Sequence, residues 1–419
     1  MNLLRLAAKS VWNRRLTAAL VVLSIAIGVA LLLGVERLRT QARASFSQTL
    51  TGTDLIVGAR GGPVNLLLYS VFRIGDATNN IQWRTVQALA SWPDVAWQVP
   101  LSLGDSHRGY RVLGTSAAYF EHYRYGAQRE LAFASGVAFG ALFDTVLGAE
   151  AAARLNYHVG DRIILSHGAG KVSFREHADK PFTVVGILAP TGTPVDRTVH
   201  VSLEGIEAVH VDWVAGAPLP GHTLSAEQVL ALKLVPKSVT AVLIGLKSKL
   251  SVFNVQRAIN DYRDEPLLAI LPGLTLQQLW DLLSIGEQTL LAISGLAVGC
   301  GLMVMLTALI TGLNERRREM AILRALGAHP WQIFSMLIGE ALLLSLCGVL
   351  AGFVLLQAVL WLALPVLGGQ TGLTIASWPP SVRELEMLMW VLTAGVMGGA
   401  LPAFRVYRLS LADGLTLRI

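Results

Sequence analysis

The stretch Asn314–Phe334 reads NERRREMAILRALGAHPWQIF and lies between two apolar runs. The run before it, Gln288–Leu313, carries no charged residue, and a second long apolar run follows. A helix needs about 20 apolar residues to cross a bilayer, so both neighbours are long enough to span it. The five consecutive charges from Glu315 to Glu319 cannot stay in hydrocarbon. Because this short loop carries four arginines, a cytoplasmic position is favoured.

The second half of the stretch has apolar residues at helical spacing: Met320, Ile322, Leu323 and Leu326. This spacing predicts a short amphipathic helix. Gly327 is placed to cap the C-terminus of that helix, and Pro330 suits the first turn of the next one. Arginine-rich loops also serve as positive-inside anchors, but the apolar stripe and the ALGA ending exceed what anchoring requires.

The segment ERRREMAILRALGA (residues 315–328) resembles the cytoplasmic loop of ABC-transporter permeases of the MacB, FtsX and LolC/LolE superfamily. In that family the loop is the coupling helix that seats in a cleft of the ATPase subunit. The resemblance implies coupling roles for a set of loop residues: Arg316, Arg317, Arg318, Glu319, Leu323 and Leu326.

The closing segment LPAFRVYRLSLADGLTLR (residues 401–418) also resembles the C-terminal signature of that superfamily. The matching positions are Pro402, Arg405, Arg408, Leu409 and Leu415. Ser410 and Leu411 stand where the usual signature has Asp-Pro.

Composition indicates an integral membrane protein with a substantial soluble part. Of its 419 residues, 53% are hydrophobic and 15% are charged, whereas soluble domains carry roughly 25% charged residues. Residues 36–287 contain 22 basic and 22 acidic residues, so the net charge of +6 comes entirely from the remaining segments. A nucleic-acid partner is excluded, because such a protein concentrates positive charge on its soluble domain. Cys300 and Cys347 lie inside apolar runs, which leaves no disulfide framework.

The membrane topology follows from the order of charged and apolar segments. Residues 1–16 carry four basic residues and no acid, and they predict an amphipathic cytoplasmic N-terminus. The uncharged run 17–35 is too long for a signal-peptide core and predicts an uncleaved first transmembrane helix. The later predicted segments are a second helix at 288–313, the coupling helix at 314–330, a third helix at 331–364, an outer loop at 365–386, a fourth helix at 387–404 and a cytoplasmic tail at 405–419.

Between the first two helices, residues 36–287 predict a large α+β extracytoplasmic domain with helical stalks at both ends. The runs 54–59, 95–101, 111–114, 162–166, 182–189 and 198–202 predict strands. A strand, a helix and a strand follow at 240–246, 250–262 and 267–271, which is a βαβ-like unit. The turn-rich middle, about 130–220, predicts an inserted β subdomain; the resemblance implies the same arrangement, a MacB-like porter domain with an insertion.

Small and ionisable residues within the spans are candidates for packing and function. Gly295 and Gly299 form a GxxxG pattern, and Gly348 and Gly352 form another; such pairs let helices approach closely, although glycine is also simply common in membrane helices. Glu340 is an ionisable residue at membrane depth. It lies near the cytoplasmic end of its helix, which favours pairing with the arginines of the loop, or snorkelling, over proton transfer.

Enzymatic motifs are absent from the sequence. The nearest approach to a Walker A motif, Gly168–Val172, lacks the first glycine and the hydroxyl residue, so the ATPase is expected on another chain. No cofactor is expected on this chain, with ATP and magnesium on the partner. Six of the nine histidines lie between His158 and His222. His167 and His177 are candidates for metal binding, but no pair has the close spacing of a structural zinc site, and polar loop histidines are the default.

The resemblance implies a permease subunit of a bacterial inner-membrane ABC transporter, with both termini cytoplasmic. Its expected partners are an ABC ATPase subunit, a second identical or closely related permease, and a periplasmic protein. The substrate would be a lipoprotein, lipid, peptide or small molecule. Two alternatives stay open: a non-transporting, FtsX-like regulator of an extracytoplasmic partner, and a sensor without an ATPase.

Overall fold

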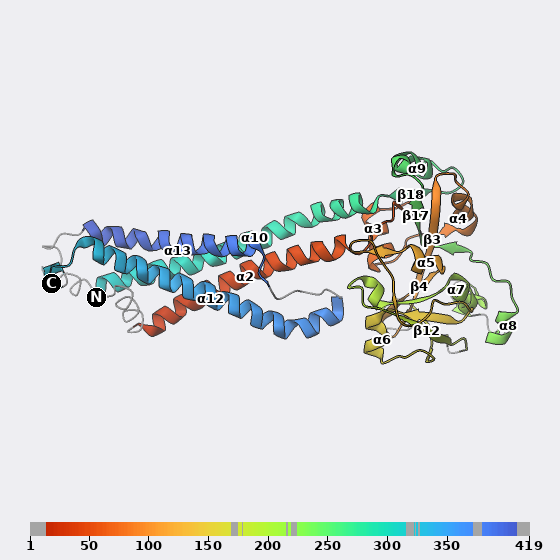
Figure 1. Ribbon diagram of the computed structural model, residues 1–419, viewed down its shortest axis with the longest axis horizontal. Coiled ribbons are helices and arrows are strands. Elements are labelled where there is room, and N and C mark those ends of the chain that lie inside the picture. The colour runs from red at the N-terminus through yellow and green to blue at the C-terminus, as the bar shows by residue number, and fades with distance from the viewer. Residues whose placement is uncertain are drawn as a thin grey trace. The chain divides into compact units, whose positions relative to one another are not determined.

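A computed structural model describes residues 14–168, 175–177, 179–214, 217–218, 224–315, 322, 324–325, 327–371 and 379–408. The chain divides into two compact units (Figure 1). A helical unit comprises residues 1–42 and 283–419, and an α+β unit comprises residues 43–282.

The helical unit is built from four long helices. They are α2 (Arg15–Ser47), α10 (Pro272–Glu315), α12 (Pro330–Thr371) and α13 (Val382–Arg408). All four are long and apolar enough to cross a membrane, which confirms the predicted four spans. Both predicted stalks are helical, because α2 continues to Ser47 and α10 begins at Pro272. α12 continues through Pro365 to Thr371, into the segment predicted as the outer loop.

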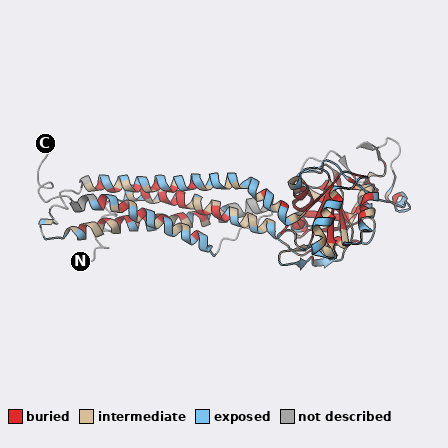
Figure 2. Cartoon of the chain, turned by 90° about the horizontal axis from the view of Figure 1, so that it is seen from above, coloured by how far each residue is buried: buried red, intermediate tan, exposed pale blue. Residues whose placement is uncertain are grey.

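Buried and exposed residues alternate along these helices at helical spacing, so each helix has one buried face (Figure 2). The buried faces form one apolar cluster, with Ile25 and Val29 from α2, Val298 and Met305 from α10, and Leu344 from α12. Because α2 contributes residues from Val21 to Leu33 to this cluster, it packs along much of its length against the other helices.

Glycines bring some of these helices into close contact. A Cβ atom on Gly28 of α2 would lie 2.8 Å from the backbone nitrogen of Val298. A Cβ on Gly348 or Gly352 of α12 would lie within 2.7 Å of atoms of Ile25 or of Ala26 and Val29. Each side chain would therefore push two helices apart, which is the physical basis of small-residue packing in membranes.

The α+β unit is organised on one mixed sheet with the strand order β18-β1-β17-β3-β4-β13-β8-β12-β7. Its strands are β1 (Leu55–Ala59), β3 (Val95–His107), β4 (Tyr110–Thr115), β7 (Phe133–Gly136), β8 (Asp144–Leu147), β12 (Phe182–Leu188), β13 (Thr198–Ser202), β17 (Ala241–Leu246) and β18 (Leu267–Ile270). Short strands β9 (Arg162–Ile163), β10 (Ser166–His167) and β11 (Arg175–Glu176) pair at its margins. Small two-stranded pairs join β2 (Ile81–Gln82) to β16 (Ser238–Val239), β5 (Arg124–Tyr125) to β6 (Arg129–Glu130), and β14 (Trp213–Val214) to β15 (Ala217–Pro218).

Short helices accompany this sheet. They are α3 (Pro63–Leu67) with a π-helical turn (Leu68–Phe72), α4 (Trp83–Ala90), α5 (Ala118–His122), α6 (Ala149–Leu155), α7 (Leu203–His210), α8 (Ala226–Leu230) and α9 (Val252–Asn260). Single 3₁₀ turns cover Pro194–Arg197 and Lys249–Ser251. The predicted inserted subdomain, about 130–220, contains α6 and α7, and its longer strands belong to the same sheet; its boundaries stay a prediction.

The predicted βαβ-like unit consists of β17, α9 and β18, but its two strands are not neighbours. β1 lies between them and pairs antiparallel with both, through Leu55↔Ile244 on one side and Ile56↔Ile270 on the other. Successive side chains of a strand point to opposite faces, and both faces of β1 are buried. Ile56 belongs to one apolar cluster, while Leu55 and Val57 belong to another that includes residues of α9.

His200 lies in the middle of this core, on β13. Its side chain is fully buried, and its Nδ1 lies 3.2 Å from the carbonyl oxygen of Val146. The rings of Tyr119 and Phe120 lie next to it, with centroids 5.4 and 5.8 Å away. Burial, assisted by the charge of Arg73, lowers the pKa of His200 to about 3. The folded chain therefore keeps His200 neutral at physiological pH.

Acidification is expected to destabilise the α+β unit through His200. Between pH 6.5 and pH 3 the unfolded chain binds a proton at this histidine and the folded chain does not. The free energy of unfolding should therefore fall by about 1.4 kcal/mol for each pH unit below 6.5, or about 2 kcal/mol at pH 5. Amide hydrogen exchange of β8 and β13 in the intact protein measures this loss. His200→Gln, which cannot titrate, should lose less protection between pH 7 and pH 5; equal losses would contradict the prediction.

Candidate functional site

The predicted ATPase-coupling residues, Arg316, Arg317, Arg318, Glu319, Leu323 and Leu326, lie outside the described residues. The structure does describe the end of that segment. Gly327 has φ +96°, a left-handed conformation that glycine adopts without strain, and its N–H donates to the carbonyl of Arg324 at 3.1 Å. α12 then begins at Pro330. Both features match the helix cap and helix start predicted from sequence.

Glu340, the predicted membrane-embedded acid, is buried on α12 with 6% of its surface exposed. It lines a cavity of about 30 Å³ together with Arg14, Thr17 and residues of α10 such as Gly312. The guanidinium of Arg14 lies 3.5 Å from the carbonyl oxygen of Gly312. Within the described residues, the basic group that shares this cavity with Glu340 is therefore Arg14, from the N-terminal end of α2. The arginines of the loop, which are the predicted partners of Glu340, lie outside the described residues.

The two predicted GxxxG patterns lie in different surroundings. Gly348 and Gly352 face α2 closely, whereas Gly295 and Gly299 are exposed on α10. Among the described residues of one chain, no atom lies within 4 Å of a Cβ placed on Gly295 or Gly299. The role of that face in helix packing stays a prediction.

A buried ion pair joins α2 to the start of α13. The guanidinium of Arg37 donates two hydrogen bonds of 2.8 Å to the carboxylate of Glu384, and both residues are only 3% exposed. Arg37 also donates to the side-chain oxygen of Gln357 on α12 at 3.3 Å. This bidentate geometry is the strongest arrangement for an arginine and a carboxylate. The pair therefore connects three of the four helices at one level.

Glu36, the residue before Arg37, forms a second group of charges at the same level. Its fully buried carboxylate accepts from Arg39 at 3.0 Å and lies 3.2 Å from the guanidinium of Arg383. Arg39 in turn lies 3.9 Å from Glu287 of α10. From sequence, Glu36, Arg37 and Arg39 are predicted to lie in the extracytoplasmic domain, and Arg383 and Glu384 in the outer loop. A sequence feature that could have indicated these buried charges is the presence of two acid–base dipeptides, Glu36-Arg37 and Arg383-Glu384, next to apolar runs.

The histidine candidates of the α+β unit are brought together with two further side chains. His167 ends β10, and His177 follows β11; they meet Asp105 of β3 and His210, the last residue of α7. One ligand atom from each of the four lies within 4.8 Å of every other. We call these four residues the Asp-His cluster. Asp105 and His210 could not be identified from sequence, because Asp105 lies 62 residues before His167 and His210 lies 33 residues after His177.

Electrostatics differ within the Asp-His cluster. A hydrogen bond with Asp105 raises the pKa of His167 above its usual value. Burial, followed by the charge of His210, lowers the pKa of His177 to about 4. Asp105 and His177 are 2% exposed, whereas the side chains of His167 and His210 are 42% and 25% exposed. The cluster thus has a buried side and a side open to solvent.

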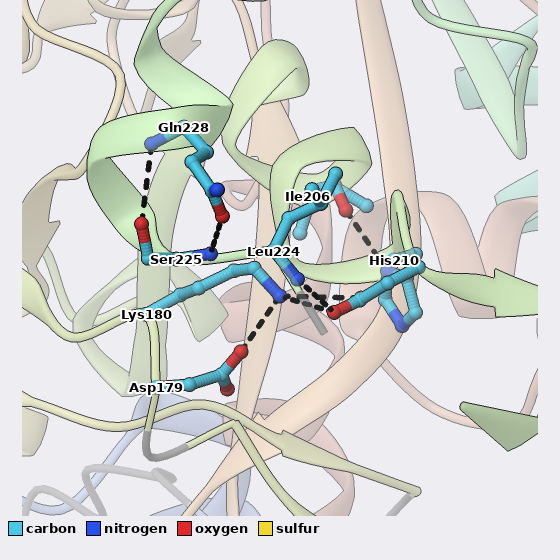
Figure 3. A network of polar contacts seen from close by, with 8 residues as sticks. Asp179, Lys180, Ile206, His210, Leu224, Ser225 and Gln228 are labelled. Atoms are coloured by element: carbon cyan, nitrogen blue, oxygen red, sulfur yellow. Dashed lines mark hydrogen bonds and ion pairs between the residues drawn. The ribbon is translucent and has the colours of Figure 1, made fainter. Parts of the chain in front are cut away.

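A buried lysine supports two of the segments that carry this cluster (Figure 3). The ammonium of Lys180, only 1% exposed, donates to Asp212 at 3.0 and 3.2 Å and to Asp179 at 2.7 Å. Lys180 lies three residues after His177, and Asp212 lies two residues after His210. The ion pair therefore holds the two histidine segments beside one another.

Comparison with known proteins places both units in one family. The model of the MacB-like periplasmic core domain matches residues 18–262, and the model of the FtsX-like permease C-terminal domain matches residues 253–411. The first match alone spans more than half of the chain. The chain belongs to the MacB/FtsX/LolC superfamily of ABC-transporter permeases. The resemblance seen in the loop and the closing segment is confirmed.

A curated relative is the macrolide export ATP-binding/permease protein MacB of Azoarcus sp. (strain BH72), which is 24% identical over 368 residues. The match covers 83% of this chain and 50% of the relative, so the chain spans about half the length of the relative it matches.

Two solved structures are also similar. The periplasmic region of MacB from Actinobacillus actinomycetemcomitans has 11% identity and a TM-score of 0.34, covering 55% of this chain and 92% of that one. The extracellular domain of the ABC-type transporter YknZ from Gram-positive bacteria has 12% identity and a TM-score of 0.32, covering 52% of this chain and 99% of that one. The family assignment rests on the two family models.

The family divides the candidate residues between two regions of this permease. The loop predicted to couple to the ATPase (residues 314–330), Glu340 and Glu384, the partner of Arg37, fall within the FtsX-like match, residues 253–411. All four members of the Asp-His cluster fall within the MacB-like match, residues 18–262. Four apolar helices and membership of a permease family make the chain a membrane protein of transporter type.

Proposed function

We propose that this chain is the permease subunit of an ABC transporter that couples ATP hydrolysis by a separate ATPase subunit to movement of an extracytoplasmic domain. The observation that best supports this proposal is that the FtsX-like and MacB-like matches together extend from residue 18 to residue 411. The continuous helices α2 and α10 support mechanical transmission, because each includes residues of both the helical and the α+β unit.

The proposed location is the bacterial inner membrane, with both termini in the cytoplasm and the α+β domain between the first and second spans on the outer side. The charge distribution supports this orientation, since residues 36–287 have no net charge and the loop at 314–330 is rich in arginine. Work would then be done outside the membrane on a lipoprotein, lipid, peptide or small molecule.

The proposed partners are an ABC ATPase subunit and a second permease, either identical or closely related. The 419 residues contain no Walker A motif, so ATP and Mg²⁺ would be held by the ATPase subunit. The proposed contact is the coupling helix, with the apolar stripe of residues 320–326 seated in the ATPase and the arginines at the membrane surface.

Leu323→Asp is expected to release the ATPase or to leave it with unregulated basal turnover. An unpaired charge buried in an apolar contact costs several kcal/mol. Arg317→Ala should have a milder effect, because one exposed ion pair contributes roughly 0–1 kcal/mol. The measurement is co-purification of the ATPase with each permease variant, together with ATP turnover in nanodiscs. Normal recovery and normal stimulated turnover with Leu323→Asp would refute the coupling role of this residue.

A further inference from the structure

The Asp-His cluster is assembled from four separate parts of the chain. Asp105 comes from β3, His167 from β10, His177 from the residue after β11, and His210 from the end of α7. β10 pairs with both β3 and β11, which brings His167 opposite Asp105 in the register of the strands. The fold therefore brings three imidazoles and one carboxylate together, and Asp105 and His210 come from segments distant in sequence from the paired strands β10 and β11.

Three distances between donor atoms of the cluster match the edges of a metal coordination tetrahedron. Nδ1 of His167 lies 3.2 Å from Oδ1 of Asp105 and 3.3 Å from Nε2 of His210, and the latter two atoms are 3.6 Å apart. Donors bound at about 2.0–2.1 Å to a tetrahedral zinc ion lie roughly 3.3–3.4 Å from one another. These three atoms thus form one face of such a tetrahedron, and His177 supplies a fourth donor within 4.8 Å of each.

The surrounding contacts orient the donors as a metal site requires. Nδ1 of His210 lies 2.9 Å from the carbonyl oxygen of Ile206 and donates its proton there (Figure 3). Its other ring nitrogen, Nε2, therefore faces His167 and Asp105. Metal-binding histidines commonly donate their second ring N–H to a backbone carbonyl in this way. Among the described residues, Oδ2 of Asp105 is buried and has no hydrogen-bond partner.

The charge of the donor set suits a divalent cation. Three neutral imidazoles and one carboxylate carry a single negative charge, and a bound divalent ion changes this to +1. Three nitrogen donors and one oxygen favour borderline metals such as zinc over magnesium or calcium, which prefer oxygen. His167 and His210 are partly exposed, which provides a route for an ion from solvent.

We propose that Asp105, His167, His177 and His210 form a binding site for a divalent first-row transition metal ion, with zinc as the best match. The site lies in the α+β unit and does not depend on the proposed function of the permease. It adds a metal-responsive element to that unit, because an ion bound there links β3, the β10–β11 hairpin and α7. The competing arrangement is a hydrogen-bonded cluster that holds no ion.

The test uses the full-length permease in nanodiscs, purified with a tag free of histidine and stripped of metal with a chelator. Zinc is titrated in competition with a chromogenic zinc chelator, and cobalt(II) is titrated in parallel as a spectroscopic probe. We expect one equivalent per chain and intense visible d–d bands for cobalt, which report four-coordinate geometry. A stoichiometry far below one, or only the weak bands of six-coordinate cobalt, would overturn the site.

Substitutions of the cluster residues test whether zinc binds at this site. His167→Ala and Asp105→Asn should each weaken zinc binding at least about 10-fold. His167 is partly exposed, so its removal leaves the core intact; exchange protection of β3 and β12 verifies folding of each variant. The matched control is His158→Ala, since this histidine is 76% exposed and lies outside the cluster. Binding that survives in His167→Ala at wild-type strength, or that is lost equally in His158→Ala, would contradict the proposal.

Discussion

Arg37→Ala is expected to lower the stability of the helical unit by about 3–5 kcal/mol, because it leaves the buried carboxylate of Glu384 without its bidentate partner. Alanine also removes the hydrogen bond to Gln357, and with it a direct connection between α2 and α12. Unfolding in mixed detergent micelles, followed by far-ultraviolet circular dichroism, measures the change. Glu384→Ala should have a similar effect, since the buried guanidinium is then the group left uncompensated.

Two comparisons separate the ion pair from general loss of packing. The double variant Arg37→Met with Glu384→Leu should recover most of the stability, because replacing a buried pair by apolar groups of similar volume is often neutral or stabilising. Arg154→Ala removes a half-exposed partner of Glu150 and should cost less than about 1 kcal/mol. If the double variant is no more stable than Arg37→Ala, the stability lost in Arg37→Ala does not come from an unpaired buried charge.

Asp212→Ala is the second change with a large expected effect. It leaves the ammonium of Lys180, which is only 1% exposed, paired with Asp179, which is 45% exposed. Breaking a buried pair costs about 3–5 kcal/mol, and the retained contact to Asp179 places the expected loss near the lower end, at about 3 kcal/mol. Amide exchange of α7 and β12 in the intact protein should report this loss of protection.

The control for this prediction is Asp179→Ala, which removes the exposed partner only. It should cost less than about 1 kcal/mol, because solvent screens an exposed pair. Lys180→Met combined with Asp212→Leu should restore protection of α7. If Asp179→Ala and Asp212→Ala lose equal protection, the contribution of an ion pair to stability does not depend here on how deeply the pair is buried.

The helices and several strands were predictable from sequence because their signals are local. Long uncharged runs marked the spans, and short runs of β-branched residues marked β1 and β13, whose predicted limits differ from the observed ones by at most one residue. The order of the sheet was not predictable. β1 lies between β17 and β18, and nothing within residues 55–59 identifies partners that lie more than 180 residues later.

In the candidate sites, too, local features were predictable from sequence and contacts between distant segments were not. His167 and His177 stood out because histidines are dense between residues 158 and 222, but Asp105 reaches them only through the pairing of β3 with β10. Arg37 and Glu384 flank apolar runs, where charged residues usually meet water or lipid head groups. Arg37 and Glu384 are buried because residues that are 320 or more positions apart in sequence, on three different helices, contact one another.

The position of β1 in the sheet also has a consequence for biosynthesis. Leu55 to Ala59 emerge from the ribosome early, yet both strands that cover them are encoded about 180 residues downstream or later. At 5–20 residues per second, this apolar segment waits roughly 10–40 s for its neighbours. During that interval its backbone amide and carbonyl groups present two open edges, which other nascent chains can pair with. Correct folding of this permease therefore depends on keeping the segment Leu55–Ala59 from pairing with other chains until the last part of the α+β unit has been translated.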